Sequence, residues 1–427
     1  MFSINFKLAF VTSLFIPVII LSSFFFHRKI GKAFRKVDEE EGHVSAIVQE
    51  NLTGVRVVRA FGREIYEKQH FEEKNEIYTD MWVKLMRIMS IFWTTADLVS
   101  YLQTLVVLVY RSYLCVHGEL TAGNYIAFMT YTGMLMWPVR MIGRVMAMLS
   151  RASISIDRIM YIMNSEEESD INAIDNVDMY QDITFENVNF NYDNSKDTLN
   201  DINLTIHKGE TIGILGGTGS GKSTLMYLLD RLYELPEENG SIKIGNTDIR
   251  NIKRSWLRKN IGMVLQEPYL FSRSLEDNIR ITSPDANHEE VSRASQIASL
   301  ERSILHFNDG YDTYVGERGV TLSGGQKQRT AIAQMLLRKT PIMIFDDSLS
   351  AVDAQTDSEI RHALKNNVDH STIILIAHRI TTLMNADKIV VMDGGRIVQM
   401  GSHDDLINQD GTYKKIYELQ LKNGLEA

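Results

Sequence analysis

A glycine-rich loop, GGTGSGKS at Gly216–Ser223, lies between the apolar run TIGIL and the helical pattern TLMYLLDRLYE. Glycines let backbone N–H groups turn inward around phosphate oxygens, at the positive end of the helix that follows. In such loops the lysine, here Lys222, reaches the β- and γ-phosphates, and the hydroxyl of the next residue, Ser223, coordinates Mg²⁺. The succession of strand, loop and helix predicts an α/β nucleotide-binding domain. We call Gly216–Ser223 the P-loop.

Two further motifs follow the P-loop. LSGGQ at Leu322–Gln326, here called the signature loop, precedes the helical stretch QKQRTAIAQMLLRK. Its serine and glycines would present hydroxyl and N–H donors at a helix N-terminus, which suits a γ-phosphate. The apolar strand IMIFDD at Ile342–Asp347 then ends in two acids. A carboxylate at the C-terminal edge of a buried parallel strand near the P-loop holds Mg²⁺ in P-loop enzymes, which indicates Asp346.

Three apolar segments predict membrane spans, at about 5–26, 88–116 and 122–149. The run Leu8–Phe26 contains no charged residue over nineteen positions, about the length needed to cross a bilayer. A cluster of positive charges comes after this run rather than before it, which is the wrong order for a signal peptide. The cluster consists of Arg28, Lys29, Lys32, Arg35 and Lys36. By the positive-inside rule it is cytoplasmic, so the N-terminus lies outside and the residues after Arg140 lie in the cytoplasm.

An alternative interpretation is that these segments are buried helices of a soluble protein. The length and apolarity of the first run argue against it. Asp97 and Arg111 interrupt the second segment. Intramembrane charges usually face a bundle interior or an aqueous path, which makes both residues weak candidates for a substrate pathway. For Arg111 we favour a simpler expectation, that its side chain snorkels to the outer surface.

Composition and charge exclude some functional classes for this chain. The net charge of −9 gives no indication of a nucleic-acid binder, and the single cysteine, Cys115, excludes an internal disulfide framework or a cysteine metal cluster. The acidic run SEEESD at Ser165–Asp170 indicates a solvated linker, which we place at 165–180. From 181 to 427, short apolar runs alternate with helical stretches, a pattern typical of a sheet with helices on its faces.

The order of P-loop, signature loop and acidic strand, behind apolar segments, resembles the ATP-binding-cassette (ABC) transporter family. Within it the chain is similar to exporter-type half-transporters of the multidrug and lipid exporter kind, and the resemblance covers nearly the whole chain. It implies a membrane α-helical bundle portion with the last three spans, residues 1–164, followed by an α/β P-loop ATP-binding cassette, residues 181–427. Between the first two predicted spans, apolar residues at three- and four-residue spacing predict two long helices joined by a short bend near 50–64. The resemblance implies that this bend is similar to a coupling helix that docks on a nucleotide-binding domain; a plain helical hairpin would have the same local pattern.

The resemblance implies roles for single residues. Gln266 matches a glutamine that contacts Mg²⁺ and the attacking water, and His378 matches a switch histidine that bonds the γ-phosphate and orients that water. Tyr192 is similar to an aromatic on which adenine stacks, and Asp353 to an aspartate that communicates across a dimer. The implied ATP-binding residues are Tyr192, Gly216, Gly217, Thr218, Gly219, Ser220, Gly221, Lys222, Ser223, Thr224, Ser323, Gly324, Gly325 and Gln326; the implied Mg²⁺ ligands are Ser223, Gln266 and Asp346; and the implied catalytic residues are Gln266, Asp347 and His378.

The family pattern also implies a partner. In ABC proteins the signature loop completes the ATP site of a second cassette, and this chain has one copy of each half-site, so we expect a second half-transporter. The family usually has Glu after the Mg²⁺ aspartate, whereas here Asp347 is one methylene shorter. A carboxylate drawn back by about 1 Å can cost on the order of a hundredfold in rate. We therefore expect slow hydrolysis at this chain's own site and a heterodimer; the other interpretation is a conservative replacement without consequence.

The second departure from the family is the number of spans. A full exporter half has six, and this sequence supplies the last three, so we expect a fragment, a truncated reading frame or a chain whose first half is encoded elsewhere. The predicted function is ATP-driven export of an unidentified substrate across the plasma (cell inner) membrane, in contact with membrane lipid. Two alternatives remain open. One is a truncated product that binds ATP and transports nothing, and the other is a soluble ABC ATPase acting on ribosomes or DNA.

Overall fold

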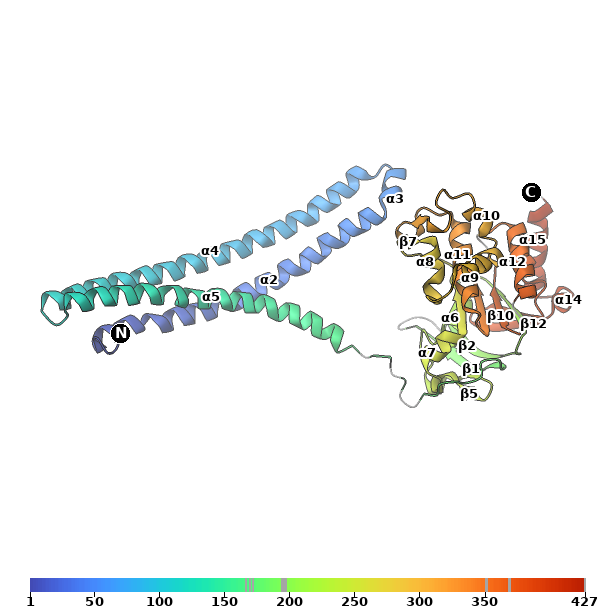
Figure 1. Cartoon of the computed structure of the whole chain (residues 1–427), viewed down its shortest axis with the longest axis horizontal. Coiled ribbons are helices and arrows are strands. Elements are labelled where there is room, and N and C mark those ends of the chain that lie inside the picture. Colours follow the sequence, from blue (N-terminus) through green and yellow to red (C-terminus); the bar gives the residue numbers. More distant parts are fainter. Residues whose placement is uncertain are drawn as a thin grey trace. The chain divides into compact units, whose positions relative to one another are not determined.

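The structure is a computed structural model that describes residues 1–165, 167–168, 170, 173–192, 198–349, 352–367 and 370–425 (Figure 1). The chain divides into two compact units, Met1–Glu167 and Glu168–Ala427. The division falls within the segment 165–180 that we assign to the acidic linker. We describe each unit by itself.

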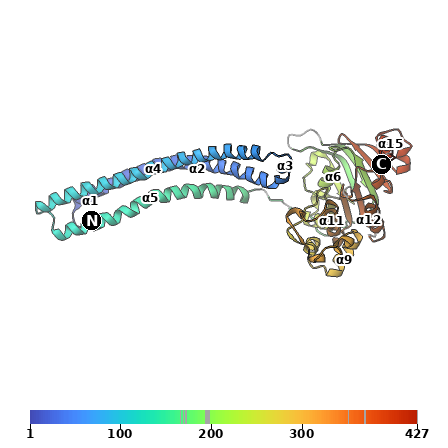
Figure 2. The same ribbon diagram turned by 90° about the horizontal axis from the view of Figure 1, so that it is seen from above.

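The first unit is built from long helices. They are α1 (Phe6–Ser13), α2 (Phe15–Thr53), the short α3 (Val55–Ala60), α4 (Glu64–Val116) and α5 (Ala122–Met163). The break between α1 and α2 has a local cause, because Pro17 lacks the N–H that would bond the carbonyl of Ser13 and its ring crowds that carbonyl. Helix α2 packs along α4 and also contacts α5 (Figures 1 and 2). The α2–α4 contact is sealed by Ile30, Val37, Leu85 and Phe92.

Among the described residues, two helical stretches are long and apolar enough to cross a membrane. They are Phe6–Thr53, with a mean hydropathy of 2.3 in its most apolar window, and Glu64–Val116, with 1.4. They contain the first two predicted spans. The third predicted span, about 122–149, lies in α5 and includes side chains that lie outside the described set.

Arg111 differs from our expectation. Its side chain is only 3 % exposed, and its guanidinium carbon lies 4.5 Å from the centre of the Tyr125 ring of α5. The Tyr125 hydroxyl in turn lies 3.4 Å from Ser112 Oγ. The prediction that Arg111 snorkels to the surface is therefore wrong, because an aromatic ring from the next helix covers the guanidinium inside the unit.

The second unit is organised around a six-stranded sheet in the order β12-β11-β3-β10-β9-β6. Five strands are parallel, and only the edge strand β12 runs antiparallel. The strands are β3 (Thr211–Gly216), β6 (Ile261–Val264), β9 (Ile342–Asp346), β10 (Thr372–Ile376), β11 (Lys388–Asp393) and β12 (Arg396–Gly401). Ile376 pairs with both Ile214 and Asp346, so β3, β10 and β9 end together at one edge.

Smaller sheets and helices complete the unit. A four-stranded sheet has the order β2-β1-β4-β5, and β7 pairs with β8. The bounds are β1 (Ile183–Phe190), β2 (Leu199–Ile206), β4 (Ser241–Ile244), β5 (Thr247–Asp248), β7 (Arg273–Ser274) and β8 (Tyr314–Val315). The helices are α6 (Lys222–Leu229), α7 (Arg254–Asn260), α8 (Leu275–Ile279), α9 (His288–Ile297), α10 (Glu301–Ile304), α11 (Gly324–Arg338), α12 (Ala354–Asn367), α13 (Ile380–Leu383), α14 (His403–Ile407) and α15 (Thr412–Leu425).

Both faces of the parallel sheet are buried, which explains why its strands are apolar runs rather than alternating ones. Successive side chains of β9 point to opposite faces. Ile342 and Ile344 join a core with α6 and the four-stranded sheet, whereas Met343 and Phe345 join a core with α9, α11 and α12. The predicted α/β class of this unit is confirmed.

Candidate functional site

The P-loop connects the end of β3 to the start of α6. Gly219 and Gly221 have φ values of 81° and 93°, in the left-handed region that glycine adopts without cost. At Gly216 an added Cβ would lie 2.4 Å from the carbonyl oxygen of Met392, closer than real Cβ atoms approach. The loop therefore takes its tight course because of glycine, and this course leads the chain into the N-terminus of α6, where a phosphate is favourably placed.

Lys222, the first residue of α6, folds back over the loop. Its Nζ donates hydrogen bonds to the carbonyl oxygens of Gly216 at 2.9 Å and Gly217 at 2.8 Å, and the side chain is only 6 % exposed. Burial lowers the pKa of the ammonium group, and the negative charges of Asp346 and Asp347 act in the opposite direction. The Lys222 ammonium group thus lies over the P-loop and interacts with the carboxylates of Asp346 and Asp347. This place suits a lysine that binds the β- and γ-phosphates of a nucleotide.

Asp346 ends β9 at the same sheet edge. It is 2 % exposed, and its Oδ1 accepts a hydrogen bond of 3.0 Å from Ser223 Oγ. Its Oδ2 is buried and has no hydrogen-bond partner among the described residues. Burial raises the pKa of this carboxyl, and the hydrogen bond from Ser223 opposes the rise.

A buried carboxylate oxygen without a partner, beside a hydroxyl, fits a divalent cation. Within the described residues no group of three or more His, Cys, Asp or Glu side chains is arranged to hold a metal. Mg²⁺ needs no such group, since it is usually bound through one or two carboxylates together with substrate phosphates and water. Asp346 and Ser223 are therefore suited to hold Mg²⁺ when a nucleotide supplies the remaining oxygens.

Asp347 has an unusual backbone. Its φ of 47° lies in the left-handed region, which few non-glycine residues adopt. Its N–H donates to the carbonyl oxygen of Ile376 at 2.9 Å, so this residue is tied to the end of β10. Its negative charge contributes to the raised pKa of Asp346, which places the two carboxyls within electrostatic reach of each other.

Gln266 and His378 follow β6 and β10, which lie on either side of β9. Both side chains are exposed. The backbone of Gln266 accepts a 3.1 Å hydrogen bond from Gln328 Nε2 of α11, and the backbone of His378 accepts one of 2.8 Å from Gln420 Nε2 of α15. His378 acts on Asp346 electrostatically and lowers the pKa of that carboxyl. The parallel sheet thus brings both residues to the edge that carries the P-loop and Asp346.

Tyr192 lies in an aromatic cluster. Its ring meets those of Phe190 and Tyr233 edge to face, with centroid distances of 5.1 and 5.0 Å. Its hydroxyl lies 3.1 Å from Oγ1 of Thr224, in the first turn of α6. Sequence reasoning missed Tyr233, because nothing in its local pattern shows that it meets a residue 41 positions earlier. Adenine stacking on Tyr192 remains a prediction.

The signature loop leads into α11. Ser323 caps this helix in a capping box: its Oγ accepts from the N–H of Gln326 at 3.3 Å, and Gln326 Oε1 accepts from the N–H of Ser323 at 2.8 Å. The Ser323 hydroxyl still has its own proton to donate. Both Ser323 and Gly324 are exposed, and a Cβ added at Gly324 would meet nothing within 4 Å. This helix N-terminus therefore presents its donors to an open surface.

Comparison with known proteins finds matches both to family models and to individual relatives. The family model described as ABC transporter matches residues 199–350, and the model described as ABC transporter transmembrane region matches residues 1–139. The ABC transporter ATP-binding protein YwjA of Bacillus subtilis is 36 % identical over 423 residues, which are 99 % of this chain and 73 % of that protein. The chain belongs to the ABC transporter family.

Other members of the ABC transporter family agree with this assignment. The probable multidrug resistance ABC transporter ATP-binding/permease protein YheI of Bacillus subtilis is 37 % identical over 424 residues, 98 % of this chain and 72 % of that protein. A solved structure of a bacterial Atm1-family ABC exporter with ATP bound superposes with a TM-score of 0.93 at 31 % identity, over 98 % of this chain and 74 % of that one. The predicted family and the combination of helical transmembrane domain with α/β nucleotide-binding domain are confirmed.

Asp353 caps a helix of the ABC cassette. Its carboxylate accepts from the N–H of Thr356 at 2.9 Å and from Oγ1 of the same residue at 2.7 Å, and these hydrogen bonds lower the pKa of Asp353. The contacts explain an acid at this position by local helix capping. Communication across a dimer remains a prediction for this residue.

Asp230, the C-cap residue of α6 in this ABC cassette, has no local sequence signal that would mark it as special. Its Oδ1 is buried and accepts no hydrogen bond from the described residues. Burial raises the pKa of Asp230 to about 6, although the charges of Arg258 and Arg338 oppose the rise. Both arginines lie far along the chain, so no local pattern could reveal this environment.

We expect Asp230→Asn to stabilise the cassette at neutral pH. Because the pKa of Asp230 is about 6 in the folded state against an ordinary value of 3.8, the folded state binds this proton more tightly. The free energy of unfolding therefore falls as pH rises between these two values, by at most about 3 kcal/mol. Asparagine stays neutral and removes this loss.

The measurement is the thermal unfolding midpoint of the cassette at pH 4.5 and pH 7.5. The variant should gain on the wild-type chain at the higher pH by a few degrees, since about 1 kcal/mol moves the midpoint of a domain this large by roughly 2–4 °C. Asp285→Asn, at an exposed position, is the matched control. An identical pH dependence in wild type and Asp230→Asn would contradict this account of Asp230.

Proposed function

We propose that this chain drives the export of a substrate out of the cell, as one half of a dimeric ABC exporter. The observation that carries the proposal is the union, in one polypeptide, of apolar helices long enough to cross a membrane with a sheet edge that gathers Lys222, Ser223 and Asp346. Several relatives carry names that refer to multidrug export, and the superposed structure is an exporter. The chemical class of the cargo stays unassigned.

The nucleotide site is proposed to form between two cassettes. Ser323 and Gly324 are exposed at the N-terminus of α11, where backbone donors and the helix dipole favour a phosphate. The chain has one P-loop and one signature loop. We propose that its P-loop binds ATP against the partner's signature loop, while its own signature loop serves the partner's ATP.

At its own site the residues have separate tasks. Lys222 and the P-loop backbone bind the phosphates, and Asp346 and Ser223, with Gln266, would hold Mg²⁺, which neutralises charge that develops on the phosphates. His378 and Asp347 position the attacking water. Tyr192 stacks on adenine, a contact of about 0.5–1.5 kcal/mol. The remaining glycines and hydroxyl groups of the P-loop lie close to the phosphates and help to bind them.

Helix α3 is the proposed coupling helix. It lies between α2 and α4 within the segment 50–64. Val57 and Phe61, in α3 and just after it, are 60 % and 76 % exposed. Large apolar side chains gathered at a short exposed helix suit a docking contact. We propose that this contact transmits the closing of two ATP-loaded cassettes to the membrane helices.

We propose that the chain lies in the plasma membrane, with its N-terminus outside and the cassette in the cytoplasm. Support comes from the positive charges that follow Leu8–Phe26 and from the absence of Lys and Arg in the turn His117–Asn124. Accessibility of a cysteine introduced at residue 2 or in the cassette to an impermeant maleimide, in intact cells, tests this orientation.

The partner is proposed to be a different half-transporter. Asp347, in the left-handed region, stands where the family usually has Glu, and the shorter side chain leaves its carboxylate about one methylene further from the water. A site weakened in this way is best complemented by a partner with Glu at that position. The intact signature loop of this chain would then serve the partner's stronger site.

Asp347→Glu tests the weakened site directly. We expect the variant to raise ATP turnover at this chain's own site by about tenfold or more, because a displacement near 1 Å is worth up to on the order of a hundredfold. The measurement is phosphate release by the purified full-length chain with its partner in lipid nanodiscs. Asp347→Asn, which should abolish turnover at this site, is the control. An unchanged rate in Asp347→Glu would remove the argument for a heterodimer.

Export itself is tested by flux. Inverted membrane vesicles that contain the chain and its partner should accumulate a fluorescent amphiphile such as Hoechst 33342 when ATP is added, and the Lys222→Ala variant should not. Membrane insertion and ATP binding without flux of any probe from a panel of drugs, lipids and peptides would instead favour a transport-incompetent ATP-binding product. A chain that remains in the soluble fraction would favour the non-transport ATPase.

A further inference from the structure

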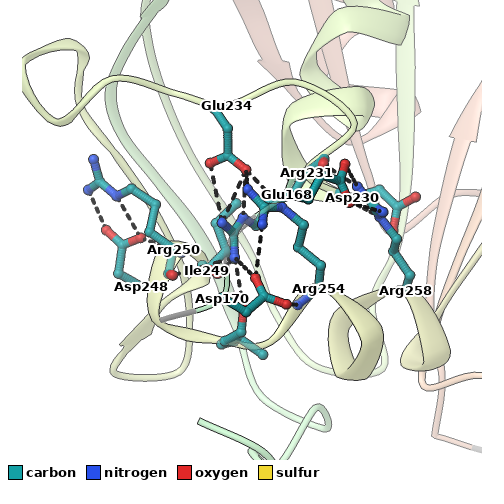
Figure 3. Close-up of polar contacts among 11 residues, drawn as sticks. Glu168, Asp170, Asp230, Arg231, Glu234, Asp248, Ile249, Arg250, Arg254 and Arg258 are labelled. Atoms are coloured by element: carbon teal, nitrogen blue, oxygen red, sulfur yellow. Dashed lines mark hydrogen bonds and ion pairs between the residues drawn. The ribbon is translucent and has the colours of Figure 1, made fainter. Parts of the chain in front are cut away.

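From Glu168 onward, the described residues of the acidic linker belong to the same unit as the cassette. Glu168 accepts two hydrogen bonds from one guanidinium, at 2.8 Å from Arg258 Nη1 and 2.9 Å from Nη2 (Figure 3). This pair holds the pKa of Glu168 below its usual range. The Glu168 side chain is 59 % exposed and that of Arg258 33 %, so the pair alone contributes little to stability. Its importance lies in its position, because it fixes the linker at the surface of α7.

Asp170 makes a stronger attachment two residues later. Its Oδ2 accepts from the backbone N–H of Arg254 at 2.9 Å, and its Oδ1 accepts from Arg254 Nη1 at 3.0 Å (Figure 3). Arg254 is the first residue of α7, and Lys253 before it makes no side-chain capping bond. Asp170 therefore supplies the missing cap of α7 from 84 positions away, and it places an acid at the favourable end of the helix dipole.

The linker then continues beside the residues that lead into α7, which it contacts through backbone groups. The N–H of Ile174 donates to the carbonyl oxygen of Asn251 at 2.7 Å, and that of Lys253 donates to the carbonyl oxygen of Ile174 at 3.1 Å. Trp256 Nε1 donates to the carbonyl oxygen of Val177 at 3.0 Å. We call residues 168, 170 and 173–177 the strap. Its described residues are bound side by side with the segment that leads into α7.

Arg231 joins the strap to the P-loop helix. It follows Asp230, the C-cap of α6, and it has a φ of 50° and is only 6 % exposed. Its Nη1 donates to the carbonyl oxygens of Ile249 at 3.1 Å and Ile252 at 2.8 Å, and it lies 3.8 Å from Asp170 Oδ1. The guanidinium also contacts Glu234 (Figure 3).

A second connection runs parallel to the first. Arg258, which holds Glu168, also donates from Nη2 to the carbonyl oxygen of Arg231 at 2.7 Å. Through Arg258, Glu168 is therefore joined to the residue that Asp170 contacts directly, Arg231. That residue stands one position beyond the cap of α6, a helix of eight residues whose other end is Lys222 and the P-loop. A displacement of the strap must either break these bonds or move the C-terminal end of α6.

We propose that the strap is a mechanical connection between the membrane unit and the P-loop helix, separate from the docking of α3, and that Asp170 and Arg231 are positioning residues for nucleotide-driven movement. The inference rests on the proposed function, because it assumes that ATP binding moves the membrane helices. On this proposal the strap transmits movement, whereas its sequence alone is typical of a solvated tether. Two-state elements joined by a chain of hydrogen bonds are the physical basis of such coupling.

The test uses the full-length chain with its partner in lipid nanodiscs and compares Glu168→Gln and Asp170→Asn with Glu167→Gln, a neighbouring exposed acid. One readout is the affinity for the fluorescent nucleotide TNP-ATP. The other is the change in hydrogen exchange of α2 and α4 when MgATP is added. We expect the two strap variants to reduce the nucleotide-induced exchange change about two- to tenfold, with TNP-ATP affinity within about twofold of wild type. Glu167→Gln should alter neither readout.

If Asp170→Asn disturbs folding, a second experiment that swaps the charges of Glu168 and Arg258 still tests the proposal. Glu168→Arg alone should reduce the exchange change, and Glu168→Arg combined with Arg258→Glu should restore most of it. Two results would overturn the proposal. One is a nucleotide-induced change in hydrogen exchange that stays at the wild-type value in all strap variants. The other is an equal loss of nucleotide affinity and of that change, with no rescue by the double variant. If MgATP leaves α2 and α4 unaltered even in the wild-type chain, the proposed transport function fails as well, and the two failures are thereby distinguished.

Discussion

Replacing Lys222 with alanine is expected to lower ATP turnover at this chain's own site by about 10²–10³-fold, the usual effect of removing one preorganised electrostatic donor from such a site. Lys222 is 6 % exposed, and its ammonium group donates to the P-loop carbonyls of Gly216 and Gly217. Alanine removes the cation that would neutralise the β- and γ-phosphates, and with it a positive charge that interacts with Asp346 and Asp347. The measurement is phosphate release by the full-length chain with its partner in nanodiscs.

The control for Lys222→Ala is Lys415→Ala, at an exposed position of α15. This variant removes an equal charge from the cassette and should keep the wild-type rate. The unfolding midpoint of Lys222→Ala should be measured alongside, because the two carbonyls lose their donor and become free to bind water. A folded Lys222→Ala chain that retains wild-type turnover at its own site would contradict the role given to the P-loop.

Gly324→Asp is expected to abolish turnover at the site that this chain completes for its partner, again by about 10²–10³-fold. The position is exposed, and an added Cβ would meet nothing within 4 Å. An acid in the first turn of α11 is favourable for the helix dipole, so the fold should be preserved or slightly stabilised. The new carboxylate would instead stand where the γ-phosphate of the partner's ATP binds.

Gly324→Ala separates charge from bulk in this experiment. It adds a methyl group without charge and should reduce the rate far less than the acid does. Phosphate release is measured with the partner's own P-loop intact. Full turnover at the partner's site in the Gly324→Asp variant would contradict the assignment of the signature loop to the second cassette.

The sequence predicts the P-loop, the acidic strand and the α/β class well because each depends on contiguous residues. TIGIL followed by glycines and Lys222 can form only a few structures, and the alternation of Ile342 to Phe345 between two cores follows from strand geometry. Because β3 and β9 run parallel on either side of β10, their carboxyl ends lie at one edge of the sheet, and Asp346 comes to Ser223 across 123 positions. Secondary-structure patterns thus suffice to place these residues.

Other features depend on partners that no local pattern reveals. Arg111 was expected at the surface because hydropathy along one helix does not show that Tyr125 of the next helix covers it. The capping of α7 by Asp170, and the burial of Asp230 between distant arginines, are likewise contacts across 28 to 108 positions. An acidic run in isolation is typical of a solvated tether. Only the folded chain shows that two of its carboxylates bind the cassette.

The central claim is that ATP is bound between two polypeptides. The most direct measurement is ATP turnover resolved by molecular mass. The full-length chain is co-expressed with its partner and solubilised in detergent, and one-cassette and two-cassette species are separated by size-exclusion chromatography with light scattering. Phosphate release per chain is then measured in each species. We predict turnover only in the two-cassette species, and its loss at one of the two sites in Gly324→Asp. Equal turnover per chain in the one-cassette species, unaffected by Gly324→Asp, would contradict the account.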